Sequence, residues 1–252
     1  GKKNYEKSDR VLGNATALLI IFGLLITIFG QVFLNKLLIW FGASPAILPH
    51  AKEYMRIILI GTVFQVVSMG MNNFLRADGK PKMSMITMLV GAGLNVILDP
   101  IFIYALRMGM SGAAIATIIS QFVSMVWSIH HFLKRDALHR IQLRYMRLDR
   151  DLALEITSLG MPGFLIQLFS SILNLILNNA LVIYGGDIAV SGMGIVTSIA
   201  TLLVLPVIGL NQGLQPIVSF NYGAKNYERV NKAARLAIII ATCMTSFGFI
   251  LI

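Results

Sequence analysis

Long runs of apolar residues, separated by short polar segments, are the main pattern along this chain. Six complete runs cover residues 12–34, 54–75, 84–106, 112–133, 155–183 and 188–219, and a seventh begins near 235. A helix of about 20 apolar residues crosses the hydrocarbon layer of a membrane and satisfies its own backbone hydrogen bonds. The alternating short strands of a membrane barrel are absent. The pattern therefore predicts an all-α polytopic membrane protein with six full spans and the start of a seventh.

The positively charged residues lie on alternate connectors between these spans. All but four of the 21 Lys and Arg lie in or directly beside four segments: 1–10, 76–83, 134–154 and 220–234. The exceptions lie at the opposite ends of the spans: Lys36, Lys52, Arg56 and Arg107. The positive-inside rule places the four basic segments in the cytoplasm. The net charge of +10 is then an orientation signal, and we expect no nucleic-acid partner.

A short motif occurs twice, as GKKNYE from residue 1 and GAKNYE from residue 223. Both copies lie on the predicted cytoplasmic side, and six spans separate them. An even number of crossings makes the repeat parallel, so we expect two six-helix lobes in a protein of about twelve spans. The chain would cover parts of both lobes, cut at both ends: residues 1–133 as spans 3 to 6, the cytoplasmic linker 134–154, and residues 155–252 as spans 7 to 9. The basic stretch 134–151 is expected to be a solvated connector near lipid headgroups.

Asp99 stands inside the third span, whereas the other ten of the 11 acids lie in connectors or at span ends. An ionisable residue in a span costs about 3 kcal/mol on insertion scales and marks a candidate functional site. The alternative is a structural acid paired with Arg107, but eight residues of helix are too long for a direct contact. Function is the favoured interpretation.

Two features close to Asp99 supply further oxygen atoms that could bind an ion. Pro100 cannot donate to the carbonyl of Val96, so we expect the helix to bend there and leave an acceptor free. Asn95 lies one helical turn before Asp99 and on the same face. The patch suits a proton or a hard cation, so Asp99 and Asn95 form a possible Na+ site.

Tyr54 and Thr117 lie at a similar depth in the outer half of neighbouring spans, and they are candidates for the same cation-coupling site. Tyr54 alone would be an interfacial anchor and Thr117 alone a helix–helix contact, and these alternatives stay open. Polar stripes on other spans supply candidates for a substrate cavity, although interhelical hydrogen bonding explains each stripe too. These candidates are Gln65, Gln121, Gln167, Asn174 and Asn178.

Motifs of other chemistries are missing from the sequence. It contains no Walker-type phosphate loop, no H-E-x-x-H and no paired-cysteine metal pattern. We therefore expect neither direct ATP use nor an enzyme, and no cofactor beyond H+ or Na+ as a coupling ion. The four histidines lie at span ends or in connectors, and they are assigned no function.

The stretch MNNFLRADGKPKMSMITMLVGAGLNVILDPIFIY, followed by GMSGAAIATIISQ, resembles the multidrug and toxic compound extrusion (MATE) transporters. GMPGFLIQLFSSILNLILNN and GLNQGLQPIVSFNYGAKNYERV are similar to the second half of that family. The resemblance implies two six-helix lobes that exchange H+ or Na+ for organic, often cationic, substrates by alternating access. It also implies a polar site in the first lobe at Asp99, Asn95, Tyr54 and Thr117. Ser170 stands where some members carry a Glu, which argues against a second-lobe Na+ site.

The resulting hypothesis is a secondary efflux antiporter in the plasma membrane, of the kind found in the bacterial inner membrane. We expect the full-length protein to be monomeric. Its expected partners are a small organic substrate and the lipid bilayer. A flippase for lipid-linked or polysaccharide precursors on a related frame is the nearest alternative. It predicts a basic cavity, whereas the span interiors here contain no Lys or Arg. A non-transporting membrane scaffold is the third possibility, and it leaves Asp99 without a purpose.

Overall fold

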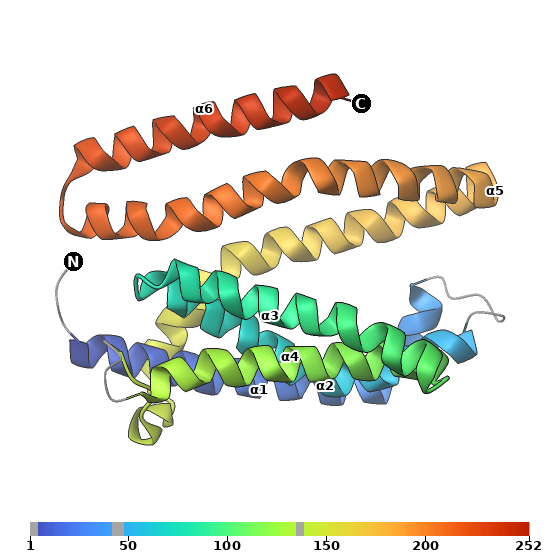
Figure 1. Ribbon diagram of the computed structural model, residues 1–252, viewed down its shortest axis with the longest axis horizontal. Helices are drawn as coiled ribbons and strands as arrows, with labels where there is room; N and C mark the ends of the chain where they lie inside the picture. Colours follow the sequence, from blue (N-terminus) through green and yellow to red (C-terminus); the bar gives the residue numbers. More distant parts are fainter. Residues whose placement is uncertain (1–4, 42–47, 135–138, 252) are drawn as a thin grey trace. The chain divides into compact units, whose positions relative to one another are not determined.

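The computed structural model describes residues 5–41, 48–134 and 139–251, and these residues form helices joined by short turns (Figure 1). Within these ranges there is no β-strand. The elements in chain order are α1 (Tyr5–Trp40), α2 (Leu48–Ala77), α3 (Pro81–Pro100), the π-helical turn η1 (Ile101–Ala105), α4 (Gly109–Leu133), the 3₁₀ turn η2 (Leu143–Met146), α5 (Arg150–Gly223) and α6 (Tyr227–Leu251).

Seven helices in the described part of the chain are long and apolar enough to cross a membrane. The long element α5 supplies two of them, 150–181 and 192–223, because Gly186 interrupts it with φ 60° and ψ −163°. Glycine reaches this backbone region at little cost, so the break falls in the predicted connector 184–187. The all-α polytopic prediction is confirmed.

The seventh helix is longer than the sequence pattern predicted. It begins at Tyr227 rather than near 235. Asn226 precedes it, and its Oδ1 accepts a hydrogen bond from the backbone N–H of Arg229 at 3.4 Å, as an N-cap does. The first two turns of α6 are polar, and hydrophobic runs alone therefore place its start too late.

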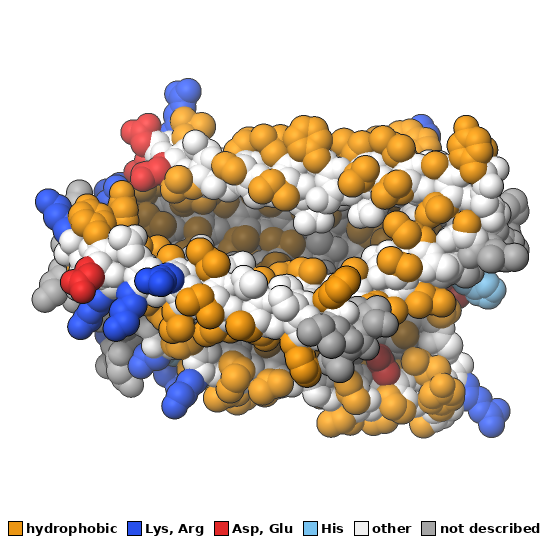
Figure 2. Space-filling model, turned by 90° about the horizontal axis from the view of Figure 1, so that it is seen from above, with side chains coloured by type: hydrophobic (Ala, Val, Ile, Leu, Met, Phe, Trp, Pro, Cys, Tyr) orange, Lys and Arg blue, Asp and Glu red, His pale blue; other side chains and the backbone are white. Residues whose placement is uncertain are grey.

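The chain divides into two compact units, one ending at Phe164 and the other beginning at Leu165. In the first unit α2 packs against α1 and α4, and α4 packs against α3. A buried core joins α1, α2 and α4 at the end that carries the basic segments: Leu12, Val67, Met71, Leu75 and Phe132. The positive-inside rule predicts that this end faces the cytoplasm, and we call it the cytoplasmic end and the opposite end the outer end. The second unit contains the rest of α5 together with α6. Hydrophobic side chains cover the middle of the helices and charged ones gather near their ends, as expected for helices facing lipid (Figure 2).

Small residues allow the helices of the first unit to approach closely. A Cβ atom added to Gly23 in α1 would lie 3.0 Å from the Cα of Val63 in α2. The approach permits Thr27 Oγ1 to donate to the backbone carbonyl of Leu59 across the same pair of helices, at 2.7 Å. Membrane helices associate through such close packing and interhelical hydrogen bonds because lipid supplies no hydrophobic drive between them.

The turn between α2 and α3 holds these two helices together. Gly79 adopts φ 75° in this turn, and Pro81 occupies the first turn of α3. Arg76 Nη1 donates to Ser84 Oγ at 3.0 Å, and Ser84 Oγ donates in turn to Asn72 Oδ1 at 3.0 Å. The buried polar chain fixes the hairpin at the cytoplasmic end.

The described part of the linker is docked on α1, which differs from the solvated connector that its charge suggested. Asn14 is 2% exposed; its Nδ2 donates to the carbonyl of Tyr145 at 3.1 Å, and its Oδ1 accepts from the N–H of Asp149 at 2.8 Å. Arg10 forms an ion pair with Asp149 at 2.7 Å. A Cβ on Gly13 would lie 2.6 Å from the Tyr145 carbonyl oxygen, so only glycine allows this approach.

Candidate functional site

The last turn of α3 and the first half of α4 bring three of the candidate residues together. Asn95 Nδ2 donates to Asp99 Oδ1 at 3.2 Å and to Thr117 Oγ1 at 3.4 Å. Thr117 Oγ1 donates in turn to the backbone carbonyl of Ala113 at 2.9 Å. All three side chains belong to half-buried residues. The amide of Asn95 thus joins a carboxylate on its own helix to a hydroxyl on the neighbouring helix.

The backbone changes at the residue after Asp99. Pro100 ends α3, and η1 continues the chain in π-helical geometry. The carbonyl of Phe102 in η1 lies against Gly112 of α4, where an added Cβ would lie 2.8 Å from the oxygen. Single π-helical turns occur frequently at functional sites. The irregular turn here is packed against α4 beside the polar cluster.

Tyr54 lies on α2 at the same end of the first unit. Ser111 Oγ at the start of α4 donates to Glu53 Oε1, which ties this turn of α2 to α4. Tyr54 itself is half-buried, and among the described residues no hydrogen bond joins it to Asp99, Asn95 or Thr117. Tyr54 therefore lies on a helix that packs against α4, but it is not a hydrogen-bonded member of the cluster.

The five candidate cavity residues fall into two groups. In the first unit, Gln65 is exposed on α2, and Gln121 is half-buried on α4. Gln121 Oε1 is buried without a hydrogen-bond donor in the described part of the chain. Gln167, Asn174 and Asn178 are exposed on α5 in the second unit, as is Ser170, whose hydroxyl bonds the carbonyl of Ile166 at 2.8 Å.

Sequence reasoning missed a buried acid–histidine cluster at the cytoplasmic end. The Asp78 side chain is 3% exposed, with its Oδ2 3.3 Å from His131 Nε2 and its Oδ1 3.3 Å from His139 Nδ1. These residues come from the α2–α3 turn, α4 and the linker, so no local pattern links them. Over the described ranges, no group of three or more His, Cys, Asp or Glu is placed to hold a metal ion. The cluster joins the α2–α3 turn to α4 and to the linker.

Comparison with known proteins decides the family. The MatE family matches residues 1–101 and 162–252. The chain belongs to the MATE family. It is 29% identical over 250 residues to the multidrug export protein MepA of Staphylococcus haemolyticus, covering 97% of this chain and 55% of that protein.

Solved MATE structures agree with this assignment. The outward-facing conformation of a multidrug resistance MATE transporter is 32% identical, with a TM-score of 0.87 over 96% of this chain and 54% of the other. An inward-facing conformation is 33% identical, with a TM-score of 0.76 over 97% and 56%. The chain spans about half the length of the relatives it matches. It is therefore a multi-pass membrane protein of a transporter family.

Proposed function

We propose that the chain is part of a secondary antiporter that exports small organic, mainly cationic, compounds in exchange for H+ or Na+. The MepA relatives are multidrug export proteins, and MATE family transporters have been solved in an outward-facing and in an inward-facing conformation. Alternating access between two such states is the transport mechanism that we assign to this protein. We assign the protein to a bacterial inner membrane, with the basic segments 1–10 and 134–154 on its cytoplasmic side, because positive charge gathers on that side of membrane proteins.

The single observation that carries the proposal is the position of Asp99. It is a half-buried acid inside a span, and its hydrogen bond comes from Asn95 at 3.2 Å rather than from a cation. No Lys or Arg lies in the span interiors to neutralise it. A buried carboxylate without a fixed positive partner gains stability by taking up a proton or a metal cation. Asp99 is therefore the coupling acid.

The cluster offers three oxygen donors to such an ion. Asp99 provides a carboxylate, Thr117 a hydroxyl and Asn95 an amide oxygen once its amide turns over. Hard cations prefer oxygen ligands of this kind. Binding an ion would replace the bonds through Asn95, and it would change how α3 packs on α4 beside the π-helical turn. An ion shifts the equilibrium between the two states only as far as its affinities for them differ.

The test is the D99N variant of the full-length protein, reconstituted in vesicles with imposed pH or Na+ gradients and a panel of organic cations. We expect gradient-driven export to be lost, because a neutral amide cannot exchange a proton or attract a cation. The gradient that drives the wild type identifies the coupling ion.

A matched control is D151N, which removes an exposed acid from the start of α5. Export should continue in this variant. Wild-type export by D99N, with unchanged pH and Na+ dependence, would contradict the role of Asp99. Export of lipid-linked anions in place of organic cations would favour a flippase instead.

A further inference from the structure

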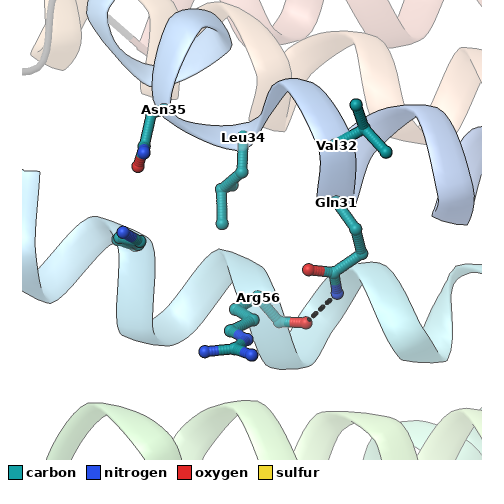
Figure 3. Close-up of a pocket in the computed structure, with 6 residues that line it drawn as sticks. Gln31, Val32, Leu34, Asn35 and Arg56 are labelled. Carbon is teal, nitrogen blue, oxygen red and sulfur yellow. Dashed lines mark hydrogen bonds between the residues drawn. The ribbon is translucent and has the colours of Figure 1, made fainter.

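A pocket of about 420 Å³ opens between α1 and α2, at the end of the helices opposite to the basic cytoplasmic segments (Figure 3). Its lining is Gln31, Val32, Leu34, Asn35, Lys52 and Arg56. Pockets of this size accept small ligands. It contains none of the residues of the Asp99 cluster, so it is a separate feature of the first unit.

The two walls of the pocket differ in chemistry. Gln31 and Asn35 are four residues apart on α1, and Lys52 and Arg56 are four residues apart on α2, so each pair shares a helix face. Gln31 Nε2 donates to the backbone carbonyl of Arg56 at 2.6 Å and holds the walls together (Figure 3). Asn35 points from α1 toward α2 in the same view. The amides of α1 and the cationic residues of α2 thus line the same pocket.

In the part of the chain that the structure describes, the positive charges of this pocket have no acidic partner. No carboxylate lines it, and within the described residues no ion pair involves Lys52 or Arg56. The adjacent acid, Glu53, accepts a hydrogen bond from Ser111 of α4. Lys and Arg are under-represented on the outer side of membrane proteins. Two of the four outer cations of this chain therefore meet at one pocket without a counter-charge.

The arrangement suits one class of ligand. A guanidinium offers a planar fork that bonds two oxygens of a phosphate, and an ammonium adds a point charge. The amide of Asn35 can donate from the opposite wall, while Val32 and Leu34 supply apolar surface beside the charges. The outer ends of membrane helices lie at the level of the lipid headgroups. A phosphate group attached to an apolar chain would find a partner in the charged, the amide and the apolar residues that line the pocket.

The geometry points to a binding site for a phosphate-bearing anion between α1 and α2, with Lys52 and Arg56 as its cationic ligands and Asn35 as a donor. Two sources share this chemistry: the headgroup of an anionic phospholipid and free phosphate in solution. The site lies apart from the coupling acid, so binding here and ion coupling at Asp99 are separate properties.

The experiment uses the full-length protein in detergent micelles and measures bound lipid by native mass spectrometry during titration with phosphatidylglycerol. The K52Q/R56Q variant should bind this lipid at least about tenfold more weakly, because each charged hydrogen bond is worth more than the free energy of a tenfold change. The R56K variant keeps the charge but loses the planar fork, and it should show an intermediate loss. Thermal unfolding of each variant verifies that it folds.

The matched control is K36Q/R107Q, which removes two positive charges from the same side of the protein at positions outside the pocket. It should bind phosphatidylglycerol as the wild type does. Equal affinities of the two double variants would overturn the proposal, and so would wild-type protein that binds neither phosphatidylglycerol nor inorganic phosphate.

Inorganic phosphate distinguishes the two sources. If phosphate binds alone and displaces the lipid, and K52Q/R56Q weakens both, the site takes a soluble anion. If phosphate does not compete while K52Q/R56Q still weakens the lipid, the ligand is the headgroup. If K52Q/R56Q fails to fold, the single variants R56K and N35A are measured in its place. Wild-type affinity for phosphatidylglycerol in both of these variants would also overturn the proposal.

Discussion

Polar side chains at the two ends of the first four helices differ in how deeply they are buried. At the cytoplasmic end, Asn14, Asn72 and Asp78 are deeply buried or enclosed, and their contacts reach other elements at 2.8–3.3 Å. At the outer end, Asp99 and Thr117 are half-buried and meet through Asn95 at 3.2 and 3.4 Å. The distances overlap, and the difference between the two ends lies in burial: the residues of the outer cluster are only half-buried, whereas Asn14 and Asn72 are almost fully enclosed.

The difference separates polar groups that hold the fold from those that can change partners. The cytoplasmic networks tie together α1, α2, α3, α4 and the linker, and breaking any of them would leave buried groups unpaired. The outer cluster has a carboxylate whose donor is a neutral amide, and under our proposal a proton or a cation takes the place of that amide. Substitutions at the two ends should therefore affect different measurements.

The largest loss of stability is expected from D78A. It removes the buried carboxylate that lies 3.3 Å from both His131 and His139, and leaving buried polar groups without their partner costs up to about 3 kcal/mol. The free energy of unfolding of the full-length protein in mixed micelles should fall by that amount. D151A, at an exposed acid, is the control and should unfold like the wild type. An unchanged free energy in D78A would show that the cluster does not stabilise the fold.

N14A should lower the free energy of unfolding by somewhat less than D78A does. Its amide bonds the carbonyls of Arg10 and Tyr145, both at 3.1 Å, and accepts from the Asp149 N–H at 2.8 Å. Alanine leaves these backbone groups unpaired, at about 2 kcal/mol in total because water can reach the linker. Limited proteolysis should then cut the 139–149 segment faster than in the wild type. Equal cleavage rates would mean that Asn14 does not hold the linker.

The fold could be predicted from the sequence because the features that determine each helix are local in the chain. The length of each apolar run predicts a span, and Gly186 broke α5 inside the predicted connector. The cytoplasmic networks were not accessible, since Asn14 and Asp149 are 135 positions apart. A polar residue at the end of a span looks solvent-exposed in a sequence. Only the packing of α4 and the linker encloses Asp78.

In the candidate site, too, contacts within one helix could be predicted from the sequence, whereas contacts between helices could not. Asn95 and Asp99 are one turn apart on one helix, and such a pair can be read from spacing alone. Thr117 required an argument about depth, because its contact depends on how α4 packs beside α3. Tyr54 was placed by the same argument, yet it is not bonded to the other three. An argument from depth alone therefore does not identify the hydrogen-bond partners of a side chain.

The smallest change in stability, with a large change in transport, is expected from T117V. The hydroxyl of Thr117 accepts the 3.4 Å bond from Asn95, and interhelical hydrogen bonds in membranes contribute only about 0.6 kcal/mol on average. The free energy of unfolding should hardly move. If Thr117 contributes an oxygen to the coupling ion, the concentration of H+ or Na+ that drives half-maximal export should nevertheless shift.

T87V is the matched variant, because Thr87 lies fully buried in the cytoplasmic half of α3 and makes the same kind of bond to a carbonyl one turn back, at 2.9 Å to Met83. Both substitutions remove one hydroxyl from a helix at the same volume. Export by T87V should keep the ion dependence of the wild type. An equal shift in both variants would mean that the hydroxyls act through helix packing alone, and the contrast between the two ends of the first unit would then fail at the outer end.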